Sequence, residues 1–279
     1  MQKAIQIAYN ELFALKCQCA AEAGFKHIAV NFNNVLDKSE DEWKLMTEDI
    51  QRILDENKLK CVQSHLHCYD LLQSSEIPDE RSDFAIHQSI IATGALGGKH
   101  GVYHPRSSVS TGFRTSVSFE DNRRILSGFL DTAVKSGVSL AVENIPVFPD
   151  HCKWQFYSSD FEDLAALVDS FIDPHICACW DFGHANLMDF PQTEALRYLG
   201  TRIKCTHIHN NFGVNDDHAT PDTGNIDWYN ILPVLAEIGY NGPLTLETHC
   251  RYDEPELLRS FARHNYTCIE FLEGLIKKK

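Results

Sequence analysis

Short runs of β-forming residues alternate with longer helical patterns along the whole of this 279-residue chain. Eight such pairs follow one another at intervals of about 35 residues, and no change in composition marks a linker between domains. Eight strand–helix units are the number that closes a (β/α)8 barrel, the TIM-barrel architecture. The sequence therefore predicts an α/β fold in which residues 1–279 form a single barrel domain.

Apolar spacing, caps and glycines predict where the elements lie. We expect strands at residues 4–8, 27–32, 60–65, 101–104, 139–144, 176–181, 203–209 and 243–248. We expect helices at residues 10–23, 41–57, 81–96, 119–136, 159–170, 192–199, 228–238 and 254–275. Ser159 and Glu162 have the spacing of a helix capping box, and Gly24, Gly137 and Gly239 stand where helices end. A doubly wound sheet is disfavoured, because no Gly-x-Gly-x-x-Gly motif follows the first strand.

Charge and hydropathy exclude several classes of protein. The net charge of −14 disfavours a nucleic-acid partner, because phosphate contacts need clustered Lys and Arg. No run of 18 apolar residues is present, so we expect no membrane-spanning helix. The first residues lack the apolar core of a signal peptide, and we expect a cytoplasmic protein whose ten cysteines are reduced. Assembly into a homo-oligomer stays open.

Side chains that bind metals stand at the carboxyl ends of the predicted strands, from the third to the eighth. In a barrel these ends converge on one site, although they are far apart in sequence. The side chains are His65, His104, Glu143, Asp181, His184, His209 and Glu247, and the loop after them adds Asp216 and His218. Mixed imidazole and carboxylate ligands suit a divalent ion, Mn²⁺ or Zn²⁺ most naturally. The sequence therefore predicts a metal site at this end of the barrel.

Two of these acids interrupt apolar runs. Glu143 follows Leu-Ala-Val and Glu247 follows Leu-Thr-Leu, positions at which an unpaired charge is costly. A buried salt bridge, or a carboxylate that accepts backbone hydrogen bonds, is the alternative explanation for both. Asp181 and His184 have an alternative too, since they can cap and support a turn. Unrelated packing reasons do not explain why so many ligand-type residues occupy equivalent strand ends.

Several short motifs resemble the xylose-isomerase-like TIM-barrel superfamily, and together they cover essentially the whole chain. They are Gln63-Ser64-His65-Leu66, Val102-Tyr103-His104-Pro105, Ala141-Val142-Glu143-Asn144, Trp180-Asp181-Phe182-Gly183-His184-Ala185-Asn186, His207-Ile208-His209-Asn210-Asn211, Asp216-Asp217-His218, Gly224-Asn225-Ile226-Asp227-Trp228 and Leu246-Glu247. This superfamily holds sugar and sugar phosphate isomerases and epimerases, and also endonuclease IV. The resemblance implies an enzyme of carbohydrate metabolism that acts on a small sugar or sugar phosphate.

The resemblance also implies a ligand set. The four-ligand core shared with the ketose 3-epimerases corresponds to Glu143, Asp181, His209 and Glu247. The larger set that holds three zinc ions in endonuclease IV is completed by His65, His104, His184, Asp216 and His218. The expected cofactor is therefore one to three divalent ions, zinc or manganese.

Three positions depart from the family pattern or need a choice. His67 competes with His65 as the ligand, because the chain has His-Leu-His where the family often has Pro, and we prefer His65 because it ends the strand. Asn210 replaces an acidic residue that usually follows His209. His207 is interpreted as a neighbour of the metal or a substrate contact and not as a ligand, because the family's metal histidine matches His209.

The predicted reaction is proton abstraction next to a carbonyl. Glu143 and Glu247 form the catalytic acid/base pair, and a divalent ion stabilises the enediolate. His184 and His207 are candidate substrate contacts. Arg106, with Lys153, is a weaker candidate for binding a substrate phosphate. Loop aromatics that can stack on a sugar, or that have no function, are Phe113, Trp154, Phe156 and Phe212.

Two other functions remain in competition. The complete ligand set also fits an endonuclease IV-like zinc-dependent phosphodiester hydrolase, in which clustered ions activate water. The acidic charge and the lack of a basic, aromatic-rich loop weigh against it. A sugar-binding or regulatory barrel that has lost catalysis is the third hypothesis, since a fold alone does not prove activity.

Overall fold

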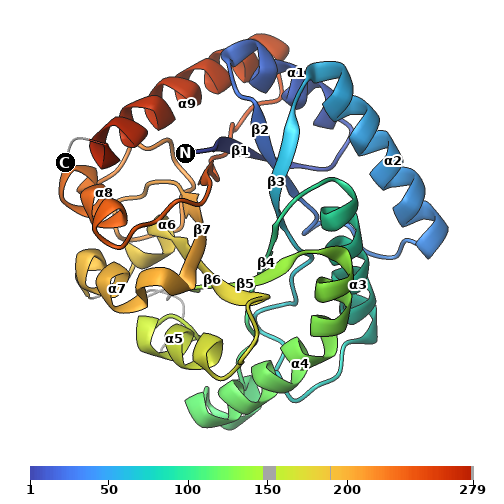
Figure 1. Cartoon of the computed structure of the whole chain (residues 1–279), viewed down its shortest axis with the longest axis vertical. Coiled ribbons are helices and arrows are strands. Elements are labelled where there is room, and N and C mark those ends of the chain that lie inside the picture. Colours follow the sequence, from blue (N-terminus) through green and yellow to red (C-terminus); the bar gives the residue numbers. More distant parts are fainter. Residues whose placement is uncertain (147–154, 189, 278–279) are drawn as a thin grey trace.

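The strands pair in sequence order, all parallel, and close into a barrel where β1 meets β8 (Figure 1). The computed structural model describes residues 1–146, 155–188 and 190–277. The strands are β1 (Lys3–Ala8), β2 (His27–Asn31), β3 (Lys60–His65), β4 (His100–Tyr103), β5 (Ser139–Glu143), β6 (Ile176–Asp181), β7 (Ile203–Ile208) and β8 (Leu244–Leu246). The predicted TIM barrel is therefore confirmed.

Helices connect successive strands, and the longer ones form the outer ring of the barrel (Figure 1). They are α1 (Phe13–Ala23), α2 (Glu40–Asn57), α3 (Glu80–Ala95), α4 (Thr115–Ser136), α5 (Phe161–Asp169), α6 (Phe182–Ala185), α7 (Gln192–Leu199), α8 (Trp228–Glu237) and α9 (Pro255–Ile276). Two short 3-10 helices, Val109–Thr111 and Gly200–Arg202, lie in the loops. None of the described helices has both the length and the apolarity needed to cross a membrane.

Alternation along each strand separates two cores. On β5, Leu140 and Val142 belong to the large apolar cluster that also contains the buried residues of the helices. The intervening Ala141 belongs to a separate small cluster, together with Val102, Cys177, Cys179 and Cys205. Because successive side chains of a strand point to opposite faces, this small cluster fills the barrel interior. The next inward position on β5 is Glu143, which lies at the end of the strand.

The helix ends show how local chemistry set the boundaries. The predicted capping box at Ser159 is wrong: α5 is capped by Asp160, whose side chain accepts from the Glu162 backbone N–H, while the Ser159 hydroxyl donates to a carbonyl. Asp offers a charged acceptor and so prevails over the neighbouring Ser. A true capping box opens α2, with Ser39 and Glu42. The helix α6 was not predicted, because it has only four residues.

The seam of the barrel is its least complete part. β8 pairs with β1 only from Lys3↔Leu244 to Ile5↔Leu246, whereas β1 continues beside β2 as far as Ala8↔Asn31. Outside the seam, α9 lies next to α1 (Figure 1). The upper part of β1 therefore has no strand partner on the β8 side.

All the cysteines that the structure describes are free thiols, as expected for reduced cysteines. Cys152 lies outside the described residues. Most of the free thiols are buried, and Cys68 and Cys250 are partly exposed.

Candidate metal centre

The deepest part of the site joins the ends of β5, β6, β7 and the residue after β8. His207 Nδ1 lies 2.7 Å from Glu143 Oε1, 2.7 Å from Glu247 Oε2 and 4.0 Å from Asp181 Oδ2. Glu143, Asp181 and His207 are fully buried and Glu247 is 6% exposed. One ligand atom from each of the four lies within 4.8 Å of the others, which is close enough to share one ion. We call these four residues the deep group.

The deep group differs from the predicted ligand core in one residue, and the assignment of His209 to that core stays a prediction. His207 takes the place that the sequence analysis gave to His209, although both histidines point into the barrel. Strand alternation put them on one face, but it did not say which of them lies level with the carboxylates. β7 is offset so that Asp181 pairs with His207, and His209 lies one step further toward the mouth.

His209 belongs instead to a second cluster near the mouth, the mouth group, with His184, Asp216 and His218. Asp216 is at its centre, because its carboxylate lies 3.4 Å from His184 Nε2, 3.5 Å from His209 Nε2 and 3.1 Å from His218 Nε2. His209 Nε2 also lies 3.1 Å from Asp181 Oδ1, so the mouth group touches the deep group.

Gly183 makes this contact between the two groups sterically feasible. A Cβ atom at position 183 would lie 1.8 Å from the His209 ring, which is far inside van der Waals contact. Asp181 fixes the start of the same turn by accepting a hydrogen bond of 2.7 Å from the His184 backbone N–H. The sequence Asp-Phe-Gly-His is therefore needed both for the α6 turn and for the space that His209 occupies.

A third cluster, the β3–β4 group, lies beside Glu143. His104 Nε2 is 2.8 Å from Glu143 Oε2 and 3.1 Å from His65 Nε2. Cys68 Sγ lies 3.6 Å from His65 Nδ1 and completes a possible metal-binding set with the two histidines. His67 points elsewhere, to the Asn33 carbonyl at 2.9 Å and to Ser82, so the structure places His65 and not His67 at the site.

The second nitrogen of several rings is held by a backbone carbonyl. Nδ1 of His184 lies 2.8 Å from the Asn144 carbonyl oxygen, and Nδ1 of His218 lies 2.9 Å from that of Glu247. Nδ1 of His65 lies 3.0 Å from the Leu66 carbonyl oxygen. An Nδ1–H that donates to a carbonyl leaves Nε2 unprotonated and available to a metal ion, as is usual for histidine ligands.

Charges in the site balance each other through these contacts. Burial opposes ionisation of Glu143 and Glu247, but His207 and other imidazoles hold the pKa of both carboxyls well below the usual range. Burial also opposes protonation of the imidazoles, yet nearby carboxylates raise the pKa of His184 to about 10 and that of His218 to about 9. In the absence of a cation, protons on the imidazoles therefore neutralise the acids.

The residues fit divalent metal ions. Several buried atoms of the deep and mouth groups have no hydrogen-bond partner: Asp181 Oδ2, Asp216 Oδ1, His207 Nε2, and both ring nitrogens of His209. Buried polar atoms are rarely left unpaired, because each costs about 1–3 kcal/mol. Imidazole and carboxylate donors at this spacing match zinc or manganese chemistry.

Other predicted site residues lie in different surroundings. The Arg106 guanidinium donates to the carbonyls of Ser74 and Ile77 and stacks 4.5 Å from the Tyr69 ring centre. These contacts tie the loop after β3 to the loop after β4, and the role of Arg106 as a phosphate contact stays a prediction. Lys153 and Trp154 lie outside the described residues.

The remaining loop aromatics differ from one another in exposure. Phe156 is buried and packs edge-on against Phe113 at 5.3 Å between ring centres, so it supports the loop. Phe212 is 60% exposed, so its ring is accessible to a ligand. Asn210, the departure from the family pattern, organises its own loop by donating to the Pro221 carbonyl.

Two residues that hold the site were not predicted. Gln6 Nε2 donates to Glu247 Oε1 at 2.7 Å. The Asn144 side chain donates to the Asp181 carbonyl and accepts from the Asp181 backbone N–H. Gln6 stands as a single polar residue within the apolar first strand, which is the same signal that identified Glu143. Cys68 carried no signal of this kind, because cysteine is common in buried positions.

Comparisons with known proteins agree with this fold. A family model described as the xylose isomerase-like TIM barrel matches residues 17–266. An uncharacterised protein of Methanocaldococcus jannaschii, MJ1311, is 30% identical over 134 residues, which are 47% of this chain and 44% of that protein. The protein y4fM of Sinorhizobium fredii is 37% identical over 84 residues, 30% of this chain and 27% of its own length. The chain thus matches less than half of each relative's length.

Solved structures resemble the chain over nearly its full length. A D-psicose 3-epimerase from Clostridium cellulolyticum H10, solved with D-tagatose, has a TM-score of 0.76 at 14% identity and covers 99% of both chains. A xylose isomerase domain protein from Alicyclobacillus acidocaldarius has a TM-score of 0.76 at 17% identity and also covers 99% of both chains. An L-ribulose 3-epimerase has a TM-score of 0.72 at 18% identity and covers 99% of this chain and 96% of its own. At these identities the likeness concerns the fold.

Proposed function

The chain belongs to the xylose isomerase-like TIM barrel family, and on that premise we propose that it is a metal-dependent isomerase or epimerase of a sugar or sugar derivative. The family model supports this reading, and so does the likeness in fold to solved enzymes that are named as sugar 3-epimerases. The substrate is expected to be an open-chain sugar with a carbonyl next to a C–H bond.

The observation that carries the proposal is the pair of buried carboxylates in the deep group. Glu143 and Glu247 come from different strands, β5 and the end of β8, and both lie 2.7 Å from the same nitrogen of His207. Both carboxylates therefore lie within reach of a single sugar bound next to His207. Such a pair can remove a proton from one face of a carbon and return a proton to the other face.

The chain's own residues prepare this proton transfer. The low pKa of Glu143 and Glu247, maintained by the imidazoles against burial, keeps both as carboxylates in the resting site, so either can accept a proton. Gln6 orients Glu247 through its amide, and His104 orients Glu143. A divalent ion held by the deep group supplies electrostatic stabilisation of the negative charge that develops on the substrate oxygen. Burial of the group excludes bulk water.

The proposal is tested by hydrogen exchange. The purified protein, loaded with Mn²⁺ or with Zn²⁺, is incubated in D₂O with a panel of ketoses and followed by proton NMR. Deuterium is expected at a carbon next to the carbonyl of at least one sugar, and chelation with EDTA is expected to stop its incorporation. If no sugar exchanges in the metal-loaded protein, the proposal fails.

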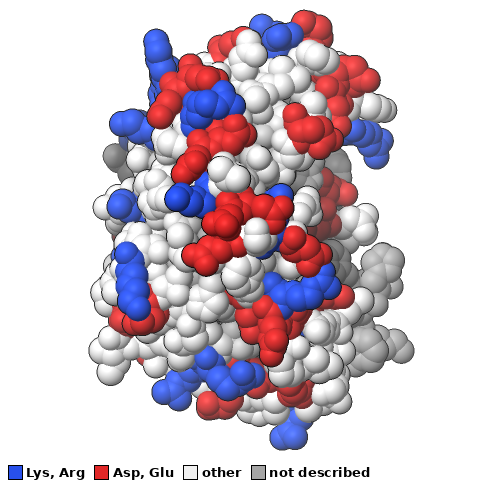
Figure 2. Space-filling view, turned by 90° about the vertical axis from the view of Figure 1, so that its right-hand side faces the viewer, with Lys and Arg blue, Asp and Glu red and all other residues white. Residues whose placement is uncertain are grey.

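A phosphodiester hydrolase is the second candidate, and one observation favours it. The mouth group and the β3–β4 group extend the deep group to three adjacent clusters, which suits several ions and not one. Against it stands the net charge of −14, since phosphate contacts need clustered Lys and Arg. On the side of the barrel over α2 and α3, basic and acidic side chains are interspersed (Figure 2). Arg52 pairs there with Asp49 and Glu56.

The two candidates are separated by a metal count and a cleavage assay. Three bound ions per chain, together with cleavage of an oligonucleotide that contains an abasic site, would favour the hydrolase. Exchange of a ketose proton without cleavage supports the epimerase.

A further inference from the structure

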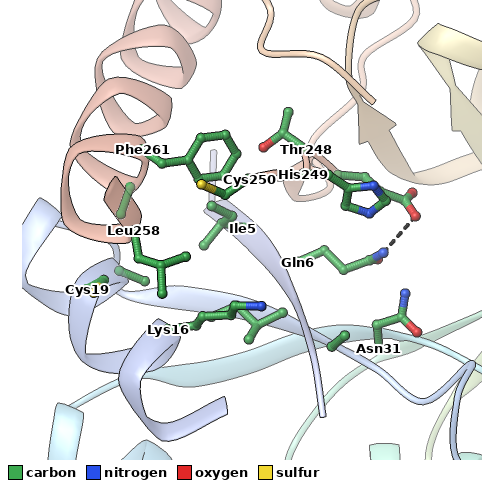
Figure 3. A pocket seen from close by; sticks show the side chains of 15 residues that line it. Ile5, Gln6, Lys16, Cys19, Asn31, Thr248, His249, Cys250, Leu258 and Phe261 are labelled. Atoms are coloured by element: carbon green, nitrogen blue, oxygen red, sulfur yellow. Dashed lines mark hydrogen bonds between the residues drawn. The ribbon is translucent and has the colours of Figure 1, made fainter. Parts of the chain in front are cut away.

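A cavity of about 150 Å³ lies beside Glu247, at the incomplete seam between β1 and β8 (Figure 3). It begins where β8 ends at Leu246 and the upper part of β1 loses its partner. Helices α1 and α9 close it from outside. We call it the seam cavity. Glu247 lines the seam cavity and belongs to the deep group, so the two places adjoin at this side chain.

One end of the seam cavity is polar. The Gln6 amide lines it, donates to Glu247 through Nε2, and keeps its Oε1 buried without a partner. Asn31 lies on the same side in Figure 3, near Gln6. A buried acceptor without a partner is uncommon, and a ligand hydroxyl is the kind of group that satisfies it. This end therefore suits a sugar hydroxyl next to the reacting carbons.

The other end is apolar. Its walls are Ile5 of β1, Cys19 and Ala20 of α1, and Leu258, Phe261 and Ala262 of α9. Figure 3 shows Ile5, Leu258 and Phe261 on the side away from Asn31. The whole seam cavity has about the volume of an engineered apolar cavity that holds benzene in another protein, so its apolar end holds at most a group of that size. Apart from Lys16, which pairs with Asp253, the side chains of this end offer a ligand no strong hydrogen bond, so a hydroxyl-free group is expected here.

The cavity offers little to an anion. Among the described residues that line it, Lys16 is the one Lys or Arg, and its Nζ lies 3.6 Å from the Asp253 carboxylate. The carboxylate of Glu247 also faces the cavity, and a second negative charge placed there would be repelled. A terminal phosphate is therefore a poor match.

We propose that the seam cavity binds the apolar end of an uncharged sugar whose reacting carbons lie between Glu143 and Glu247. The matching substrates are 6-deoxyketoses, whose chain ends in a methyl group, and sugars that carry a ring no larger than benzene. This inference rests on the proposed function and specifies its substrate. Gln6 binds a hydroxyl in the middle of the chain, and Leu258, Phe261 and Ala262 surround its end.

The kinetic test compares a ketopentose, a ketohexose, its 6-deoxy form and its 6-phosphate in the exchange assay. For the wild-type protein we expect kcat/KM for the 6-deoxyketose to exceed that for the ketohexose by roughly tenfold, the scale set by one group in an apolar pocket. The 6-phosphate is expected to be the poorest substrate. Ala262→Leu, which fills the cavity, should lower the value for the 6-deoxyketose about tenfold and leave the ketopentose unchanged.

Controls separate packing from recognition. Leu257→Ala changes the neighbouring helix position, which is 46% exposed and outside the lining, and should alter no substrate. Leu258→Ala enlarges the cavity and should favour sugars that carry a ring. A binding test needs no turnover: buffer saturated with benzene should raise the melting temperature of the wild-type protein and not that of Ala262→Leu.

The outcomes distinguish the two proposals. Exchange of all the neutral sugars at equal rates, or a best rate with the 6-phosphate, would overturn the seam cavity as the specificity site and leave the proposed function intact. An Ala262→Leu protein that folds and keeps the wild-type preference, or a benzene shift that survives this substitution, would also overturn it. Absence of exchange with every sugar would overturn the proposed function and this inference with it.

Discussion

The upper and lower parts of the barrel interior are built on the same strands but hold opposite kinds of side chain. In the lower part, Ala141, Cys177, Cys179 and Cys205 form a small apolar cluster without a charge. One inward position higher on the same strands, the side chains are acids and imidazoles, buried to the same degree. The two parts therefore share one scaffold. Side chains only two residues apart on a strand belong to the packed apolar cluster in one case and to the candidate metal site in the other.

The difference shows what each part requires. The lower cluster is stabilised by packing and tolerates a small loss of volume, as apolar cores do. The upper part depends on mutual neutralisation, since removing one partner of a buried charge pair leaves the other unpaired. Substitutions in the upper part should therefore affect function far more than an equal change in volume below.

The largest effect is expected from the two carboxylates. Glu143→Gln and Glu247→Gln should each lower the rate of substrate deuterium exchange by about 10²–10⁴-fold, the usual contribution of a general acid or base. Cys177→Ala, deeper in the same lower cluster, should leave the rate unchanged. The variants are compared by their NMR exchange rates at saturating metal. Full activity in both Gln variants would show that the acid/base pair is misassigned.

The next effect concerns the two histidines of β7. His207→Ala should weaken metal binding and exchange together, by roughly 10–100-fold, because it removes a side chain of the deep group. His209→Ala should affect the ion of the mouth group first. Elemental analysis after dialysis against defined free metal measures both. If His209→Ala abolishes exchange and His207→Ala preserves it, the original assignment of His209 to the catalytic ion is right.

Thiol reactivity should separate the two layers by pH. Burial raises the pKa of the Cys68 thiol, but His104 and His65 prevail and lower it to about 6. Alkylation of Cys68 in the metal-free protein should therefore rise as the pH increases through about 6. Burial raises the pKa of Cys177 and Cys179 well above the usual range, and these thiols should react only after unfolding.

Mass spectrometry of peptides labelled with iodoacetamide between pH 5 and pH 8 follows this difference. Added zinc should protect Cys68 and leave the labelling of Cys250, which is partly exposed, unchanged. Equal labelling of Cys68 and Cys179 in the folded protein would contradict the distinction between the layers.

The smallest effect is expected in the lower cluster. Cys205→Ala should reduce the free energy of unfolding by about 1 kcal/mol, which lowers the melting temperature by roughly 2–4 °C in a domain of this size. Metal content and exchange rate should not change. Calorimetry of the metal-free protein tests this, and a loss of metal binding in Cys205→Ala would show that the two layers are coupled.

Much of the architecture could be predicted because the barrel repeats one local pattern. The period of the strand–helix units, the glycines after helices and the acids at strand ends are all read from neighbouring residues, and they correctly indicated the fold and most of the clustered side chains. Glu143 and Glu247 were recognisable because a charge within an apolar run is unusual. Gly24, Gly137 and Gly239 do adopt positive φ angles at helix ends.

The rest depends on spatial relations that a sequence does not contain. The offset between β6 and β7, a property of paired strands, decides which of His207 and His209 lies level with Asp181. The contacts of Arg106 depend on two loops that meet only in the folded chain. The seam cavity exists because β8 is short, and a strand end cannot be located to within a residue from its composition.

Asp181 has a further consequence through its two oxygens. Its Oδ1 lies beside His184 and His209 of the mouth group, while its Oδ2 faces the deep group. An ion coordinated by one of these oxygens would polarise the carboxylate and fix its orientation, which changes how the other oxygen binds a second ion. If both groups hold an ion, their occupancies should be thermodynamically linked, and the apparent dissociation constant of each ion should depend on whether the neighbouring group is filled.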